Sequence, residues 1–184
     1  MKNLFYGPGL KAFSLIILPL MLMMSTPSYG QSNLPTGLVQ ADDLVKLELI
    51  SESNGLVPGQ VQWIGLRQDI AENWHTYWEN AGDAGAATEV SWTATGPISI
   101  SPIFWPTPEV IPFQNFLSHA YEGSPVLLFQ VKLPEDFSAS QVTLTADVFY
   151  LVCENICIPG NGSATITLPR SEERRVGKEC RSRW

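Results

Sequence analysis

Short runs in which apolar and polar residues alternate recur through the middle of this 184-residue chain. A period of two residues is typical of strands with one buried face, because successive side chains point to opposite sides of a sheet. The most regular run is 142–148, and the continuous apolar run 126–131 has the length of a buried strand. Further strands are expected at 44–50, 61–67, 88–95, 98–101 and 163–168.

No window of ten or more residues keeps a 3.6-residue period, and turn-forming residues separate the strand-like runs. Gly160-Asn161-Gly162 is expected to connect the last two strands. Two prolines exclude 104–109 from the centre of a sheet, because proline has no N–H to donate. Seven to nine short strands of this kind predict an all-β fold, an antiparallel β-sandwich. A small closed barrel is the alternative.

The first thirty residues have the pattern of a secretory signal peptide. Lys2 and Lys11 are followed by the apolar stretch 12–24, and 28–30 offers small residues for cleavage. The apolar stretch is short for a bilayer span, although an uncleaved membrane anchor is the alternative reading. Residues 31–41 are polar and predict a flexible start to the exported protein. Export implies an oxidising compartment in which disulfides persist.

Residues 170–184 form a segment of foreign composition. The stretch 171–184 holds five of the chain's eleven Lys and Arg residues. It looks like a translated sequencing adapter, so we expect a non-native tail and a natural protein that continues beyond residue 170. The alternative is a genuine basic tail with Cys180 as an odd exposed thiol.

Without its two ends the chain is strongly acidic. Residues 31–169 carry fifteen Asp and Glu against Lys46, Arg67 and Lys132, a formal net charge of −12, whereas the whole chain has −7. Nucleic-acid binding depends on phosphate neutralisation by Lys and Arg, so this composition excludes that class of partner. The remaining length suits one domain with a core of its own.

Cys153 and Cys157 are the candidate chemical site. In an extended chain their Cα atoms would lie about 13 Å apart, and a disulfide needs them within about 7 Å. The pair therefore closes only if 154–156 forms a turn. A structural disulfide is common in exported domains, but a five-residue ring stabilises by only about 2 kcal/mol. A short ring at an exposed strand end also suits attack by a partner's thiolate, so both roles stay open.

Neither a metal nor a bound cofactor is expected. Cys153, Cys157, His75 and His119 lack the paired spacing of a zinc site. All four methionines lie in the leader, which removes the thioether ligands that Cu(I) favours. His75 stands among aromatic residues and is expected to be a hydrogen-bonded structural residue.

Four motifs follow one another along the chain: 74–78 with 80–85, then 105–108, then 121–123, and finally 151–159. This ordered set resembles the periplasmic N-terminal domain of the DsbD/ScsB family of transmembrane thiol:disulfide interchange reductases. The resemblance covers residues 42–169 and implies an immunoglobulin-like antiparallel β-sandwich. The three residues between the cysteines are similar to the ScsB-like branch, since DsbD members have a longer spacing.

The resemblance also implies a function for the cysteine pair. A thioredoxin-like domain of the same full-length protein would reduce it, and the pair would then reduce an exported isomerase or oxidoreductase of thioredoxin fold. Cys157 is expected to form the mixed disulfides and Cys153 to resolve them. The domain would be periplasmic, in a full-length protein of the inner membrane. The alternative is a non-catalytic immunoglobulin-like interaction domain with a structural disulfide.

A loop caps the cysteines in this family, and by position it corresponds to 118–123. Its residues are Ser118, His119, Ala120, Tyr121, Glu122 and Gly123. Tyr121 is the candidate capping side chain, and Ala120 stands where DsbD members have an aromatic residue.

Overall fold

The structure, a computed structural model, describes residues 39–113 and 116–172. The predicted signal peptide and most of the predicted tail lie outside the described residues. The described part forms one helical turn, α1 (Ala41–Leu44), and ten strands, somewhat more than the seven to nine expected. The strands are β1 (Val45–Ser51), β2 (Val61–Ile70), β3 (Thr76–Gly82), β4 (Glu89–Ala94), β5 (Ser99–Ile100), β6 (Glu109–Phe113), β7 (Phe116–Tyr121), β8 (Val126–Lys132), β9 (Gln141–Cys153) and β10 (Cys157–Pro169).

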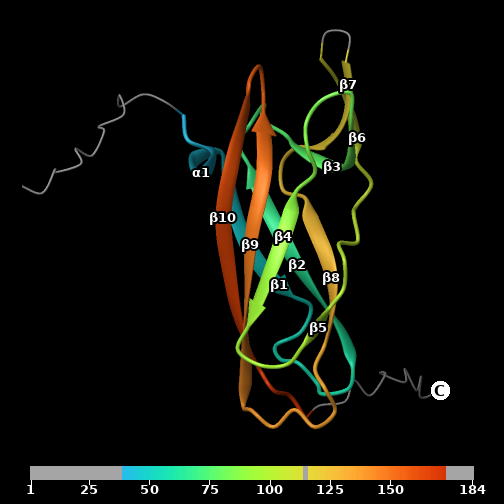
Figure 1. Cartoon of the computed structure of the whole chain (residues 1–184), viewed down its shortest axis with the longest axis vertical. Helices are drawn as coiled ribbons and strands as arrows, with labels where there is room; N and C mark the ends of the chain where they lie inside the picture. Colours follow the sequence, from blue (N-terminus) through green and yellow to red (C-terminus); the bar gives the residue numbers. More distant parts are fainter. Residues whose placement is uncertain (1–38, 114–115, 173–184) are drawn as a thin grey trace, which may run out of the picture. The chain divides into compact units, whose positions relative to one another are not determined.

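Two sheets form the layers of the fold (Figure 1). One has the strand order β1-β2-β8-β5 and the other β10-β9-β4, and all of these pairings are antiparallel. A third sheet, β3-β7-β6, lies at the end where the β9–β10 hairpin turns (Figure 1). The predicted immunoglobulin-like antiparallel β-sandwich is thereby confirmed.

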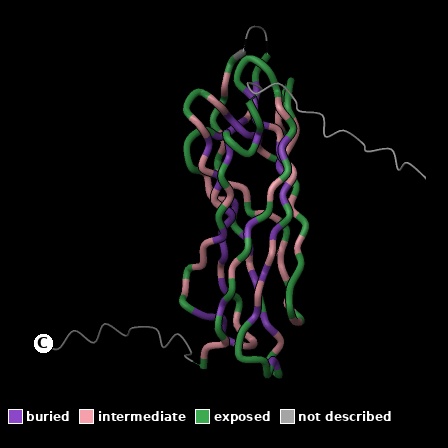
Figure 2. The backbone as a smooth tube through the Cα atoms, turned by 90° about the vertical axis from the view of Figure 1, so that its left-hand side faces the viewer, coloured by how far each residue is buried: buried purple, intermediate pink, exposed green. Residues whose placement is uncertain are grey.

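The core lies between the two layers, and β9 shows why the sequence predicts it. From Val142 to Val152, every second residue of β9 is buried, and the residues between them are exposed or half-buried. Figure 2 shows buried stretches alternating with half-buried and exposed ones along the backbone. The buried residues of β9 that face the core are Val142, Leu144, Ala146, Val148, Tyr150 and Val152. They belong to the same apolar cluster as Ile64 and Leu66 of β2 and Leu127 and Phe129 of β8. Removing this apolar surface from water is the main term that stabilises the fold.

The predicted connection at Gly160-Asn161-Gly162 is wrong. Strand β10 begins at Cys157 and pairs with β9 without interruption as far as Pro169. Because β10 is at the edge of its sheet, Pro159 can occupy it without removing a donor that a second neighbour needs. Gly160 is suited to this strand because a Cβ there would lie 2.5 Å from the ring of Tyr150. A Pro-Gly pair that predicts a turn is here part of a long edge strand.

The two predicted boundaries of the domain carry ordered contacts. Ala41, at the end of the segment expected to be flexible, is buried in α1, and its carbonyl accepts a hydrogen bond from Tyr150 Oη at 3.3 Å. Arg170 pairs with Leu56, and the N–H of Ser171 donates to the Leu56 carbonyl at 2.8 Å. The first residues of the predicted tail therefore continue the backbone pairing of the domain.

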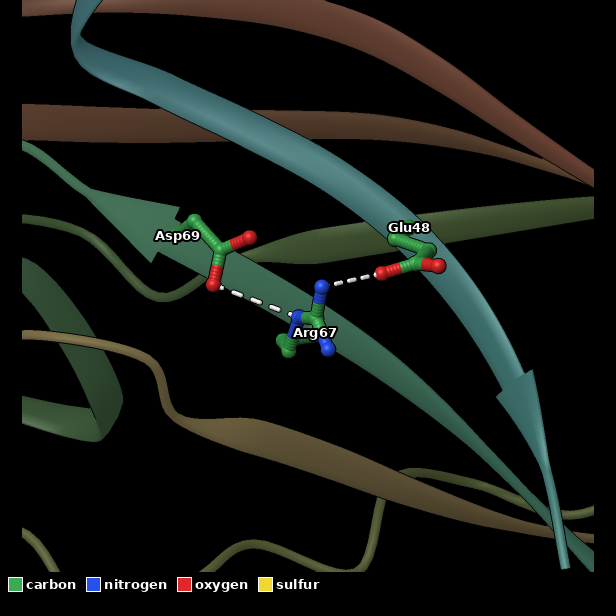
Figure 3. A network of polar contacts seen from close by, with 3 residues as sticks. All are labelled: Glu48, Arg67 and Asp69. Atoms are coloured by element: carbon green, nitrogen blue, oxygen red, sulfur yellow. Dashed lines mark ion pairs between the residues drawn. The ribbon is translucent and has the colours of Figure 1, made fainter.

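An exposed ion-pair network crosses β1 and β2 (Figure 3). Arg67 pairs with Glu48 through one guanidinium nitrogen, and its Nε lies 3.2 Å from Asp69 Oδ1. All three side chains are more than a third exposed, so water and salt screen their attraction.

Glu48→Gln is expected to lower the free energy of unfolding by less than about 1 kcal/mol. The measurement is urea unfolding at low salt and at about 1 M NaCl, where the difference from wild type should vanish because the Debye length is only about 3 Å. A loss above about 2 kcal/mol, unchanged by salt, would show that the network is not a screened surface pair.

Candidate functional site

The two cysteines form a disulfide at the tip of the β9–β10 hairpin. Cys153 ends β9 and Cys157 begins β10, directly opposite each other, with their Cα atoms 4.2 Å apart. The chain reverses through the three residues between them, where the N–H of Glu154 donates to the carbonyl of Ile156 at 3.2 Å. The predicted turn at 154–156 is confirmed.

Backbone pairing explains why the two sulfurs meet. The N–H of Cys153 donates to the carbonyl of His75 at 3.0 Å, and the N–H of His75 donates to the carbonyl of Cys153 at 2.9 Å. Because the N–H and the carbonyl of Cys153 both bond to His75, Cys153 and Cys157 face each other as a non-hydrogen-bonded pair of the β9–β10 ladder. Side chains in such pairs lie closer together than in hydrogen-bonded pairs.

The two cysteines differ in exposure. Cys153 is 2% exposed and belongs to a small apolar cluster with Tyr77 and Ala120. Cys157, at the start of the edge strand, is exposed. An incoming thiolate must reach one of the two sulfurs, and the exposed residue, Cys157, is the more accessible target.

Two aromatic side chains stand beside the disulfide. His75 is opposite Cys153 in the backbone pairing, and Tyr77 is two residues further, so both point to the same side of the strand. Tyr77 Oη lies 3.7 Å from Cys157 Sγ and 3.2 Å from His75 Nε2. Both rings are buried and meet edge to face, with centroids 5.2 Å apart. The prediction that His75 is hydrogen-bonded is confirmed, and its partner contacts the disulfide.

Local packing holds these rings in place. A Cβ on Gly85, whose φ is +101°, would lie 2.2 Å from the ring of Tyr77. Thr76, between the two rings, points the other way, and its Oγ1 donates to Gln68 Oε1 at 2.8 Å. Gln68 in turn donates to Thr88 Oγ1 at 3.2 Å, and all three polar residues are buried. A buried amide with its partners satisfied fixes the start of β3 on the sandwich.

A cavity of about 190 Å³ opens next to the disulfide. It is lined by the two cysteines with His75 and Tyr77, and by the turn residues 154–156. Ile111 of β6 and Phe116 and Ser118 of β7 also line it. Phe116 and the turn residue Ile156 are 48% and 65% exposed. The cavity therefore gives the sulfurs a largely apolar surrounding that is open to an approaching molecule.

The segment predicted as a cap loop is mostly a strand. Ser118, His119 and Ala120 belong to β7, which pairs with both β3 and β6. Ser118 reaches the cavity, and its Oγ donates to the carbonyl of Ala84 at 3.3 Å. Ala120 is buried in the cluster with Cys153, whereas His119 packs edge-on against Trp78. The prediction of a loop at 118–123 is wrong, since β7 extends to Tyr121. The strand is so short that its alternation of apolar and polar residues cannot be told from an irregular segment.

Tyr121, Glu122 and Gly123 do not line the cavity. Tyr121 ends β7, is part of the main core and donates through Oη to the carbonyl of Pro106 at 2.7 Å. Glu122 and Gly123 follow the strand and are exposed. The residues of β6 and β7 that line the cavity are thus Ile111, Phe116 and Ser118.

Burial sets the protonation of the two rings. It lowers the pKa of His75 below its usual 6.5, an effect that the nearby carboxylate of Glu122 partly offsets. It also raises the pKa of Tyr77 above 10, so this side chain stays a neutral hydroxyl. Near neutral pH the sulfur of Cys157 therefore faces a neutral hydrogen-bond relay.

Residues of the site that the sequence does not predict as site residues include His75, Tyr77, Gly85, Ile111 and Phe116. Tyr77 and Gly85 lie in the motifs 74–78 and 80–85, and the alternation of His75 and Tyr77 was the signal that could have placed both on one face. His75 and His119 are not brought together, and no group of three or more metal-binding side chains occurs in residues 39–113 and 116–172. No helix in the described part of the chain has the length and apolar character of a membrane span.

The sequence of the domain matches that of a known protein family. The family model described as "Thiol:disulfide interchange protein DsbD, N-terminal" matches residues 42–169. No curated protein sequence matches the chain.

Solved structures are similar at low identity. The N-terminal periplasmic domain of ScsB from Proteus mirabilis has 22% identity and a TM-score of 0.47, and the match covers 70% of this chain. It covers 48% of the ScsB chain, so the present chain spans about half the length of that structure. The DsbD N-terminal domain of Neisseria meningitidis in its reduced form has 12% identity and a TM-score of 0.39, with 73% of this chain and 96% of that chain covered.

The family match extends over more than half of the chain and includes both cysteines and the strands that bring them together. A disulfide in this position is the group on which thiol:disulfide interchange depends. The chain therefore belongs to the DsbD N-terminal family of thiol:disulfide interchange domains.

Proposed function

We propose that this domain relays electrons by disulfide exchange through Cys153 and Cys157, without a bound cofactor. A thioredoxin-like domain of the same full-length membrane reductase supplies the electrons, and exported proteins of thioredoxin fold receive them. The observation that carries the proposal is a disulfide at a hairpin tip with one sulfur exposed and the other buried. The signal-peptide pattern supports a periplasmic location, with the full-length protein in the inner membrane.

The proposed cycle conserves electrons and protons. A thiolate of the donor attacks Cys157 Sγ, a mixed disulfide forms, and Cys153 leaves as a thiolate and takes up a proton. The donor's second thiol then attacks the mixed disulfide, so Cys157 also becomes a thiol. In the second half, Cys157 as a thiolate attacks the partner's disulfide, and Cys153 attacks Cys157 to close the ring again. Two electrons and two protons pass from donor to partner in each cycle.

The surroundings of the sulfurs support docking of a partner. Ile156 of the ring and Phe116 of β7 both line the cavity, and both expose much of their apolar surface. Apolar residues around a reacting group are typical of the centre of a protein interface. The acidic composition of the domain favours a partner with basic residues around its own cysteines.

The reduction potential of the Cys153–Cys157 pair tests this function. We expect a value less negative than about −300 mV, because structural disulfides of exported proteins lie below that value. The pair would be equilibrated with glutathione or thioredoxin redox buffers in a Cys180→Ser background, and the reduced fraction determined by mass spectrometry after alkylation. A potential well below −300 mV would favour the alternative, an interaction domain that the disulfide merely pins.

A further inference from the structure

A row of polar groups leads from the exposed sulfur into the interior of the domain. Tyr77 Oη lies between Cys157 Sγ, at 3.7 Å, and His75 Nε2, at 3.2 Å. The tyrosine and histidine side chains are buried, at 2% and 8% exposure. In the reduced domain Cys157 must lose its thiol proton before it can attack, because the thiolate is the nucleophile. The structure places the hydroxyl of Tyr77 next to this sulfur and the imidazole of His75 next to the hydroxyl.

We propose that His75 is a positioning residue that accepts the thiol proton of Cys157 through the hydroxyl group of Tyr77. The inference rests on the exchange function proposed above. It assigns a role to a histidine that the exchange chemistry of two cysteines alone does not require. The sequence by itself predicts only a structural residue at this position.

The transfer is balanced at each atom. The thiol of Cys157 donates its hydrogen to Tyr77 Oη while the hydroxyl of Tyr77 donates its own to His75 Nε2. The S–H bond and the original O–H bond break, and a new O–H bond and an N–H bond form. The products are a thiolate, a neutral tyrosine and an imidazolium. When the thiolate of Cys157 attacks, the partner's leaving sulfur takes up one proton from water, and the imidazolium of His75 returns its proton to water through Tyr77. When Cys153 then closes the ring, its thiol proton is lost and the partner's second sulfur takes one up, so the partner gains two electrons and two protons.

The charges around the relay suit this role. Burial lowers the pKa of His75, so its ring is neutral and able to accept a proton at neutral pH. Glu122 acts in the opposite direction and stabilises the imidazolium once it forms. Glu154, exposed in the turn, is the one carboxylate among the residues that line the cavity, and it opposes a thiolate on Cys157. Tyr77 does not ionise, because burial raises its pKa.

The test measures the reactivity of Cys157 against pH. In the full chain with Cys153→Ala and Cys180→Ser, Cys157 is the remaining thiol, and its alkylation by iodoacetamide is followed from about pH 5 to 10, around the usual thiol pKa of about 8.5. We expect an additional step in the profile below about pH 7, due to His75. His75→Gln keeps a hydrogen-bonding side chain without a titrating group, and Tyr77→Phe keeps the ring without the hydroxyl. Each is expected to remove this step and to lower reactivity at pH 7 about tenfold.

The double variant separates a relay from two independent effects. Because His75 acts through Tyr77, His75→Gln combined with Tyr77→Phe should lose no more than Tyr77→Phe alone. A purely structural His75 would leave the profile unchanged in His75→Gln, and that result, or effects of the two substitutions that add, would overturn the inference. Circular dichroism and thermal unfolding confirm that each variant is folded. Failure of the exchange function itself is distinct, because the wild-type domain would then exchange with no thioredoxin-fold partner at any pH.

Discussion

Replacing Cys157 by Ala is expected to abolish electron transfer, whereas replacing Cys153 by Ala should accumulate a covalent complex with the thioredoxin-fold partner. The reason is the unequal exposure of the two sulfurs: Cys157 is exposed and Cys153 is 2% exposed, enclosed by Tyr77 and Ala120. A partner reaches Cys157, and without Cys153 nothing resolves the mixed disulfide. Exchange by Cys157→Ala should fall to the rate of a protein with neither cysteine.

Both variants would be made with Cys180→Ser and mixed with thioredoxin whose single attacking cysteine carries a thionitrobenzoate leaving group in a mixed disulfide. The remaining thiolate of the domain then displaces thionitrobenzoate and forms the adduct by exchange, without an added oxidant. Non-reducing electrophoresis and mass spectrometry then show whether an adduct forms and which cysteine it contains. The double variant Cys153→Ala with Cys157→Ala is the control for adducts formed elsewhere. An adduct at Cys153 in Cys157→Ala, with none at Cys157, would contradict the assignment of roles.

Gly85→Ala is expected to destabilise the domain by about 3 kcal/mol and to slow exchange. Its φ of +101° lies in a region that L-residues avoid, which costs about 1 to 2 kcal/mol. The new methyl group would also overlap the ring of Tyr77, because Tyr77 Cε1 lies 2.2 Å from the position that a Cβ on residue 85 would take. Overpacking of this kind costs about 1 to 3 kcal/mol. Because Tyr77 contacts Cys157, its displacement should alter the reactivity of the sulfur. Urea unfolding and exchange rates measure the two effects.

Gly123→Ala is the matched control. Gly123 also has a positive φ, +70°, but a Cβ there meets nothing within 4 Å. It should therefore show the backbone cost alone, about 1 kcal/mol, with exchange unchanged. Equal losses in the two variants would mean that contact with Tyr77 contributes nothing.

The alternation of residues predicts the sandwich well but not the small sheet beside the site. In β9 every second residue is apolar over most of its length. The sequence therefore predicts which face of this strand is buried and that the strand leads directly to Cys153. Strands β6 and β7 are short, β6 contains Pro112, and β3, which pairs with β7, is distant in sequence. Such strands owe their existence to tertiary pairing rather than to local pattern.

The site shows the same division. The turn between the cysteines follows from the reach of the chain alone, since a disulfide cannot close across four extended residues. The contact between Tyr77 and Cys157 joins residues 80 positions apart and depends on the register of β3 against β9. No local pattern carries that information. The resemblance points to Tyr121 as the capping side chain, whereas Phe116 and Ser118 line the cavity beside the disulfide and Tyr121 bonds to Pro106.

The direct opposition of Cys153 and Cys157 has a consequence for the speed of the relay. Their Cα atoms are held 4.2 Å apart by strand pairing that continues to Pro169 and needs no S–S bond. Breaking or remaking the ring therefore calls for movement of side chains and not for reorganisation of the backbone. We expect turnover to be limited by encounter with the partner, so its rate should rise in proportion to partner concentration rather than reach an early plateau.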